Sequence, residues 1–243
     1  MYLTDNYGMK ASIITLLFIL SCPVSNAQSR GVIEELWKVR DAYLNAKHFS
    51  ADVTASGYNR TGKTPVFTAV GTFRKNESGY YSRFMNDELI SNKNCTVIID
   101  HYDKSITWFD PVGAKAKKIK QEIVQLDSLM QRADSVISLG TQNGLRKFSI
   151  YEHAADIVQT DLFIDPVSIF IKRIVYYYRA PDDEQDIELA YMEITYKNIS
   201  TANIPADKFS EKKCIDYRNG KPVPTGSCSG YELTVAPNEK FKE

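Results

Sequence analysis

The feature that most constrains the fold is a series of short segments in which apolar and polar residues alternate. In residues 49–58, one face takes Phe49, Ala51, Val53, Ala55 and Gly57, and the other face takes polar residues. Alternation of this kind predicts a half-buried β-strand. We expect further strands over residues 65–74, 79–85, 95–100, 105–109, 145–152, 157–165, 171–179 and 187–196, with a basic edge strand at 114–120. Aromatic residues make up 12% of the chain, which also favours sheet.

Two segments have helical spacing instead. In residues 31–47, one apolar stripe is formed by Val32, Leu36, Val39 and Tyr43. In residues 121–139, apolar residues recur at steps of three and four: Ile123, Leu126, Met130, Ala133 and Ile137. Gly140 follows at a position that suits a C-terminal stop. We therefore predict two helices.

The order of these elements predicts the fold class. One helix, a meander of strands, an inserted helix and more strands are typical of a mainly β α+β protein. We expect a curled antiparallel sheet, forming an incomplete β-barrel, with the two helices lying against it. Residues 28–243 contain no internal repeat or linker-like tract, so we expect them to form a single domain.

The first 27 residues predict export. Lys10 precedes a short apolar run over residues 11–22, and Ser25-Asn26-Ala27 resembles a cleavage signal. The run is too short for a helix that crosses a bilayer core of about 30 Å. We expect a periplasmic protein that starts after Ala27. The alternative is a lipid anchor on Cys22, which we favour less because Leu20 and Pro23 fit a lipidation signal poorly.

The cysteines of the exported chain suit an oxidising compartment. Cys214 and Cys228 flank a turn-rich segment, and a disulfide between them would contribute about 3 kcal/mol in the chain-entropy model. Free thiols are the alternative, and a zinc site would need a second Cys/His pair that the sequence lacks. We expect Cys95 to be a buried strand residue rather than a nucleophile.

Charge and motifs argue against several functions. The chain carries 30 basic and 30 acidic residues and therefore has no basic excess for a nucleic-acid surface. It has no HExxH, CxxC, GxSxG or P-loop motif. We expect no catalytic residue, no metal site and no cofactor.

The order of several motifs resembles the LolA-like family of periplasmic lipoprotein carriers. These motifs are the strand 49–55, Gly71-Thr72-Phe73, Trp108-Phe109-Asp110-Pro111, Asp165-Pro166 and the segment from Ile204-Pro205 to Phe209. The resemblance implies an incomplete barrel whose apolar interior holds acyl chains. The family's Arg-Pro pair is missing, because Arg74 precedes Lys75 and Arg83 precedes Phe84. No residue is therefore assigned the family's release role.

The predicted function is the binding of a lipid or an acylated protein by a monomer. Six strand residues are candidates for the wall of the ligand cavity: Phe67, Phe73, Val97, Ile99, Trp108 and Tyr176. Leu126 and Met130 are the candidates from the second helix. Simple core packing is the competing interpretation for each of them. The alternative function is a non-enzymatic envelope module that senses or scaffolds a protein partner.

Overall fold

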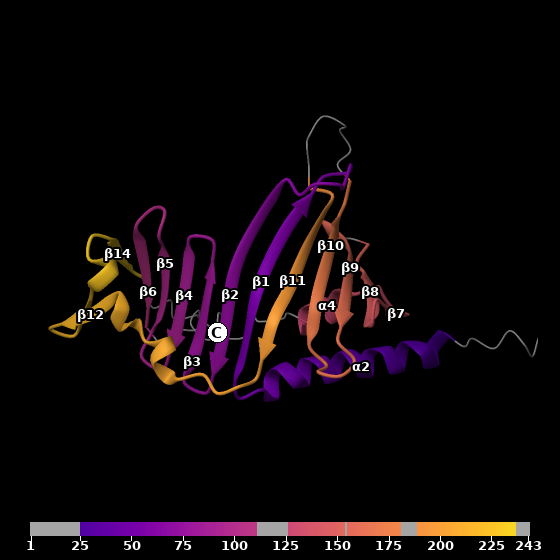
Figure 1. Ribbon diagram of the computed structural model, residues 1–243, viewed down its shortest axis with the longest axis horizontal. Coiled ribbons are helices and arrows are strands. Elements are labelled where there is room, and N and C mark those ends of the chain that lie inside the picture. Colours follow the sequence, from indigo (N-terminus) through magenta and orange to yellow (C-terminus); the bar gives the residue numbers. More distant parts are fainter. Residues whose placement is uncertain (1–24, 111–125, 154, 181–188, 237–243) are drawn as a thin grey trace, which may run out of the picture.

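The computed structural model describes residues 25–110, 126–153, 155–180 and 189–236 (Figure 1). Residues 1–24 lie outside this range, and with them Cys22 and most of the predicted signal peptide, whose last positions, from Ser25 on, belong to helix α2. The predicted strand 114–120 also lies outside the described residues. The described residues contain two α-helices, α2 (Ser25–Asn45) and α4 (Leu126–Arg132). Short 3-10 helices follow late in the chain: η1 (Ala206–Phe209), η2 (Glu211–Lys213) and η3 (Gly226–Cys228).

Fourteen strands are found among the described residues. The first seven are β1 (Phe49–Tyr58), β2 (Phe67–Asn76), β3 (Gly79–Phe84), β4 (Asp87–Asn92), β5 (Thr96–Asp100), β6 (Ser105–Phe109) and β7 (Ser135–Gln142). The others are β8 (Leu145–Tyr151), β9 (Ile157–Ile164), β10 (Ile171–Tyr178), β11 (Tyr191–Ser200), β12 (Ile215–Arg218), β13 (Lys221–Pro224) and β14 (Glu232–Val235). The strands predicted within the described residues are found in this set, with ends shifted by up to a few residues.

Twelve of these strands form one curled sheet in the order β14-β6-β5-β4-β3-β2-β1-β11-β10-β9-β8-β7. The two ends of this order do not pair among the described residues, so the sheet is open rather than a closed barrel (Figure 1). Neighbouring strands are antiparallel, except that β14 pairs parallel to β6. The expectation of a mainly β, open, curled sheet with two helices is confirmed.

Both helices pack against one face of the sheet, which we call the inner face. Leu36 and Val39 of α2 and Leu126 of α4 are buried in one core cluster with strand residues such as Phe148 and Ile174. Aromatic rings pack between α2 and the sheet. The ring centroid of Tyr43 lies 5.1 Å from the ring centroids of both Phe49 and Phe170. The apolar stripe predicted for the first helix is therefore core.

The opposite, outer face carries a second core cluster, which lies under residues 214–236, here called the C-terminal segment. Ile90, Val97, Ile99 and Ile106 of β4–β6 are buried there, together with the three cysteines 95, 214 and 228. The structure contains the predicted disulfide between Cys214 and Cys228, and Cys95 is a buried cysteine that takes no part in it. The C-terminal segment thus covers one end of the outer face and also supplies β14 to the sheet edge.

One predicted element is wrong over half of its length. Of the helix expected over residues 121–139, residues 121–125 lie outside the described residues. Leu126–Arg132 is helix α4, whereas Ser135–Gln142 is strand β7, paired antiparallel with β8. Ile137 fits the helical stripe, but it also alternates with Leu139 as in a strand, and pairing with β8 decides between the two. Gly140 does not end a helix; it lies inside β7 with a φ of 76°, where the register with β8 shifts.

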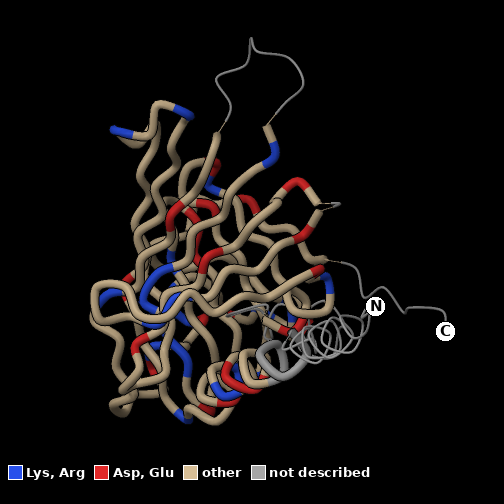
Figure 2. Tube along the Cα trace, turned by 90° about the vertical axis from the view of Figure 1, so that its right-hand side faces the viewer, with Lys and Arg blue, Asp and Glu red and all other residues tan. Residues whose placement is uncertain are grey.

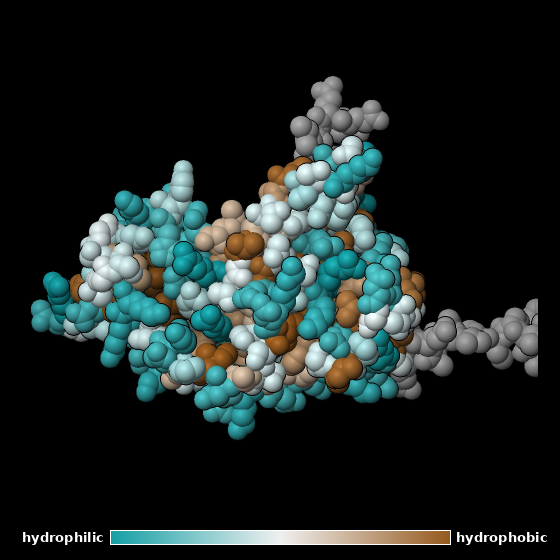
Figure 3. Space-filling model, in the orientation of Figure 1, coloured by the Kyte–Doolittle hydropathy of each residue, from teal (hydrophilic) through white to brown (hydrophobic). Residues whose placement is uncertain are grey.

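Basic and acidic residues are interspersed along the backbone trace in Figure 2. In the face shown in Figure 3, apolar and polar side chains are intermixed over the sheet. Exposed apolar side chains near the start of β2 and the end of β3 include Val66, Val70 and Met85. No helix in the described part of the chain is long and apolar enough to cross a membrane.

Candidate ligand-binding face

Strand register aligns inner-face side chains in rows across six neighbouring strands. The first row, here the aliphatic row, runs from β8 to β2 through Phe148, Leu162, Ile174, Ile194, Ala55 and Ala69. The next row, here the hydroxyl row, runs through Ile150, Thr160, Tyr176, Met192, Gly57 and Phe67. Neither row contains Lys, Arg, Asp, Glu or His.

Side chains in both rows become small where they reach β1. Ala55 faces Ala69 in the aliphatic row, and Gly57 faces Phe67 in the hydroxyl row. A Cβ added at Gly57 would overlap the Phe67 ring, so the glycine is what lets this ring lie across β1. A small residue on one strand thus allows a large neighbouring side chain to pack closely over it.

The hydroxyl row holds a buried polar atom without a partner among the described residues. Thr160 is 1% exposed, and its Oγ1 makes no hydrogen bond with them. Tyr176 lies directly opposite Thr160 on β10, and its phenol oxygen makes no hydrogen bond with any described residue. Burial is the main cause that raises the pKa of Tyr176, so its phenol stays protonated at neutral pH.

A third tyrosine lies close to this pair on the same face. Tyr196 on β11 faces Val53 of β1, next to the aliphatic row. Burial raises its pKa, and the phenols of Tyr176, Tyr43 and Tyr80 add to the shift because they are close in space. Tyr43 is already engaged, since its phenol oxygen accepts a hydrogen bond from Ile171 N at 3.2 Å.

The structure separates the eight predicted wall residues into two groups. Phe73, Tyr176, Leu126 and Met130 belong to the inner cluster, and Phe67 lies on the inner face with 42% of its surface exposed. Val97, Ile99 and Trp108 instead belong to the outer cluster under the C-terminal segment. The expectation that all eight side chains line one cavity is therefore corrected for these three.

The misplacement of these three residues has a simple cause. Val97, Ile98 and Ile99 are apolar in succession, so alternation does not say which side chains of β5 point inward, and Trp108 shares the face of Val97 through its pairing on β6. The inner face also includes Thr160 and Ile194, which sequence reasoning missed as site residues. Their signal was the alternation of β9 and β11, which needs the register with β1 before it can be used.

A small cavity separates α2 from the inner face. It has a volume of about 190 Å³ and lies between Val39 of α2 and the inner-face residues Phe148 and Ile164. Arg146 and Glu35 form an ion pair beside it, which joins β8 to α2. The interface between the helix and the sheet is thus not filled completely at this end.

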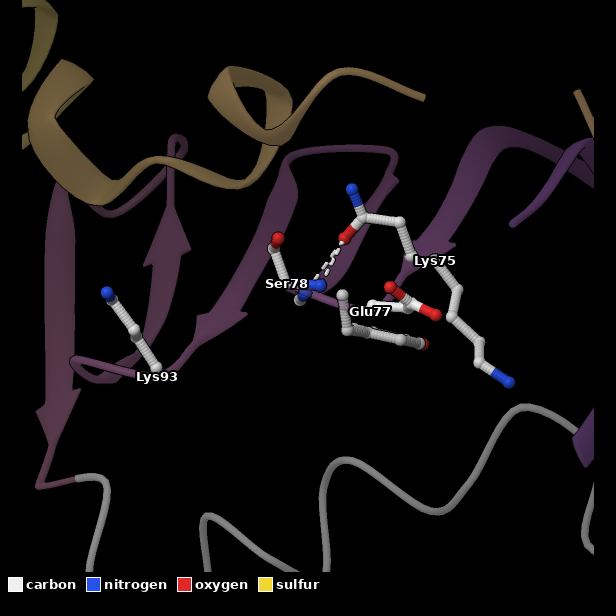
Figure 4. A pocket seen from close by; sticks show the side chains of 7 residues that line it. Lys75, Glu77, Ser78 and Lys93 are labelled. Atoms are coloured by element: carbon white, nitrogen blue, oxygen red, sulfur yellow. Dashed lines mark hydrogen bonds between the residues drawn. The ribbon is translucent and has the colours of Figure 1, made fainter. Parts of the chain in front are cut away.

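Two further pockets lie at the end of the sheet where β2 turns into β3, and polar or charged residues make up most of their lining. One of about 230 Å³ is lined by the turn between β2 and β3 and by Lys75 and Lys93 (Figure 4). Within it, Asn76 Oδ1 accepts hydrogen bonds from the backbone N–H groups of Ser78 and Gly79. The other, of about 430 Å³, lies between this turn and η2. Within the described ranges, no group of three or more His, Cys, Asp or Glu residues could hold a metal ion.

Solved structures with a similar fold are found at low sequence identity. A conserved protein from Thermus thermophilus has 8% identity and a TM-score of 0.47, covering 85% of this chain and 98% of its own. Lipoprotein LppX from Mycobacterium tuberculosis has 12% identity and a TM-score of 0.44, and the match covers 73% of this chain and 99% of LppX. A LolA superfamily protein, NE2245 from Nitrosomonas europaea, has 5% identity and a TM-score of 0.32, and the match covers 76% of this chain and 98% of NE2245.

Among these neighbours, NE2245 belongs to the LolA superfamily, the family that the order of sequence motifs resembles. No family model matches the chain, and no curated protein matches it.

Proposed function

We propose that this protein binds an apolar ligand, a lipid or an acyl chain, on the inner face of its sheet. The observation that carries the proposal is the pair of uncharged rows that cross six strands and contain the small residues Ala55, Ala69 and Gly57 at β1 and β2. An acyl chain laid along these rows would gain about 25 cal/mol for each Å² of apolar surface removed from water. In this proposal the protein acts as a carrier in the cell envelope, without a catalytic step.

The helices fit the role of a cover over this ligand. Helix α4 has seven residues and contributes Leu126, Leu129 and Met130 to the inner cluster. Isolated helices of this length are not stable in water, so α4 depends on its contacts with the sheet. A ligand that enters between α4 and the rows would therefore meet a cover that moves at low cost.

Two measurements test the proposal on the full chain. Native mass spectrometry after mild extraction should show co-purified lipid, and a fluorescent fatty-acid probe should bind to the delipidated protein. Ala69→Leu fills the small end of the aliphatic row and should weaken probe binding at least tenfold. Thr68→Leu adds the same side chain at the neighbouring residue, on the outer face, and should bind like the wild type. Equal binding by both variants would contradict the proposal.

A protein partner is the second candidate, and the edge strand β7 favours it. Its sequence SVISLGTQ has no charged residue and no proline, and Ile137 and Leu139 are exposed. Charges and prolines are the usual protection of an edge strand against pairing with another chain. The opposite edge strand, β14, is shorter and contains a charged residue, Glu232. If β7 accepts a partner strand, Ile137→Lys should abolish complex formation and leave lipid binding unchanged.

A further inference from the structure

We propose that the hydroxyl row binds the neutral carbonyl group of an acyl ester, through the hydroxyls of Thr160 and Tyr176. This inference rests on the proposed function, because it names the chemical class of the ligand on the same face. The ligand is then a lipid whose ester group enters beneath the helices with its chain, and not a hydrocarbon or a free fatty-acid anion.

The Thr160 hydroxyl is the first observation. In the described residues, two buried side-chain polar atoms have no partner, Thr160 Oγ1 and Arg173 Nε. The Arg173 guanidinium lies over the Phe163 ring at 3.8 Å, which accounts for its position. In the described part of the chain, no such contact explains the unpartnered hydroxyl of Thr160, which lies between Ile150 and Tyr176 on the inner face. An unsatisfied buried hydroxyl is unfavourable, and a ligand oxygen would satisfy it.

The second observation is that Tyr176 supplies another donor at the same place. Thr160 and Tyr176 lie directly opposite each other on β9 and β10, so a ligand that follows the hydroxyl row passes both side chains. The Tyr176 phenol has no hydrogen-bond partner among the described residues and stays protonated because burial raises its pKa. A carbonyl oxygen has two lone pairs and can accept from both hydroxyls.

The third observation decides the charge of the ligand group. The hydroxyl row and the aliphatic row contain no Lys, Arg or His that could neutralise an anion. A carboxylate or phosphate buried there would lose its hydration without a cationic partner, which is very costly. A neutral ester carbonyl loses much less and regains hydrogen bonds from the two hydroxyls. The row therefore fits the ester of an acyl chain.

A matched pair of ligands tests the inference. 1-Palmitoylglycerol and 1-O-hexadecylglycerol share the chain and the head group, but only the first has an ester carbonyl. We expect the delipidated full chain to bind the ester at least tenfold more tightly than the ether, because the ether leaves the hydroxyls without a carbonyl partner. Palmitate at neutral pH is the third ligand and should bind more weakly than the ester.

Two variants assign the difference to the named hydroxyls. Thr160→Val keeps the shape of the side chain and Tyr176→Phe keeps the ring, and each should reduce the ester-to-ether ratio to below about threefold without weakening ether binding. Thr54→Val and Tyr177→Phe are matched controls on the outer face and should retain the wild-type ratio. Thr160→Val should also raise the Tm of the ligand-free protein, since it removes an unsatisfied hydroxyl.

The outcomes separate the two proposals. Equal and measurable affinities for ester and ether in the wild type would overturn the carbonyl site and leave apolar-ligand binding intact. Tightest binding of palmitate would also overturn it, in favour of an anion site. Failure of all three ligands to bind would overturn both proposals. A retained ester-to-ether ratio in Thr160→Val and Tyr176→Phe would exclude these hydroxyls as the donors.

Discussion

Lys75 Nζ on β2 lies 2.9 Å from the backbone carbonyl oxygen of Tyr43, at the C-terminal end of α2. The same ammonium group lies 3.5 Å from the carbonyl oxygen of Leu44. The last carbonyls of a helix have no partner within the helix, and a cation there also interacts favourably with the helix dipole. Through this contact the sheet fixes the end of the helix that covers the inner face.

We expect Lys75→Met to destabilise the protein by about 1 kcal/mol, because it removes the hydrogen bonds and the charge at the end of α2. Urea unfolding followed by circular dichroism would measure the change. Lys63→Met removes an exposed lysine from the loop between β1 and β2 and should change the stability by less than about 0.5 kcal/mol. Equal effects of the two variants would contradict the role of Lys75.

The carboxylate of Asp161 predicts a pH dependence of stability. Its burial on β9 acts to raise the pKa, but hydrogen bonds from Lys147, Ser149 and Gln159 outweigh burial and lower the pKa below its ordinary value. A carboxylate with a lowered pKa stabilises the fold above its unfolded pKa of about 3.9, and this stabilisation is lost as the pH falls through the lowered value.

We therefore expect Asp161→Asn to cost about 2–3 kcal/mol at neutral pH, and to cost progressively less in acid, where the wild-type group is also uncharged. Urea unfolding at a series of pH values would measure the difference. Asp87→Asn, at an exposed position, should show no comparable pH-dependent difference. A constant cost of Asp161→Asn across the acid range would show that its charge is unimportant.

Two glycines should respond to alanine with opposite signs. A Cβ at Gly71 of β2 would overlap the carbonyl oxygen of Arg83 and lie 2.7 Å from Phe84 Cδ2 on β3. We expect Gly71→Ala to destabilise by about 1–3 kcal/mol, because the two strands must move apart. A Cβ at Gly31 of α2 meets nothing within 4 Å among the described residues. Gly31→Ala should stabilise the protein by up to about 1 kcal/mol. Thermal unfolding of both variants checks the two signs.

The disulfide between Cys214 and Cys228 should hold the C-terminal segment on the outer face. It closes a loop with a sequence separation of 14, so the double variant Cys214→Ser/Cys228→Ser should lose about 3 kcal/mol. Reductant should lower the Tm of the wild type and leave the Tm of the double variant unchanged. Limited proteolysis should then cut first in residues 214–236. An equal response of both proteins to reductant would place the redox-sensitive group elsewhere.

The alternating strands were predictable from the sequence because alternation is a local property of the residues. The same holds for the stripe Leu36, Val39 and Tyr43 of α2 and for the cysteine pair, whose intervening turns bring it together. Strand β4 was missed because its residues Asp87–Asn92 do not alternate clearly, and its place between β3 and β5 is decided by their pairing. The parallel pairing of β14 with β6 joins segments far apart in the chain and has no local signal.

The candidate site was predictable only in part. Phe73 and Tyr176 lie on the inner face as expected, but Val97, Ile99 and Trp108 lie under the C-terminal segment. A strand that is apolar on both sides contains no information about which side meets the helices. The unsatisfied Thr160 hydroxyl has no sequence signal at all, because a threonine in a strand is ordinary and its lack of a partner among the described residues depends on its neighbours.

The sequence by itself determined where most strands lie, that an apolar stripe on the first helix must be buried, and which cysteines can pair. These properties follow from periodicity and from short-range connections, which neighbouring residues set. The tertiary structure alone decided that Ser135–Gln142 is an edge strand, which side chains share the inner face, and that Thr160 and Tyr176 meet there. Each depends on register between strands, and a shift of one residue would turn every side chain to the other face.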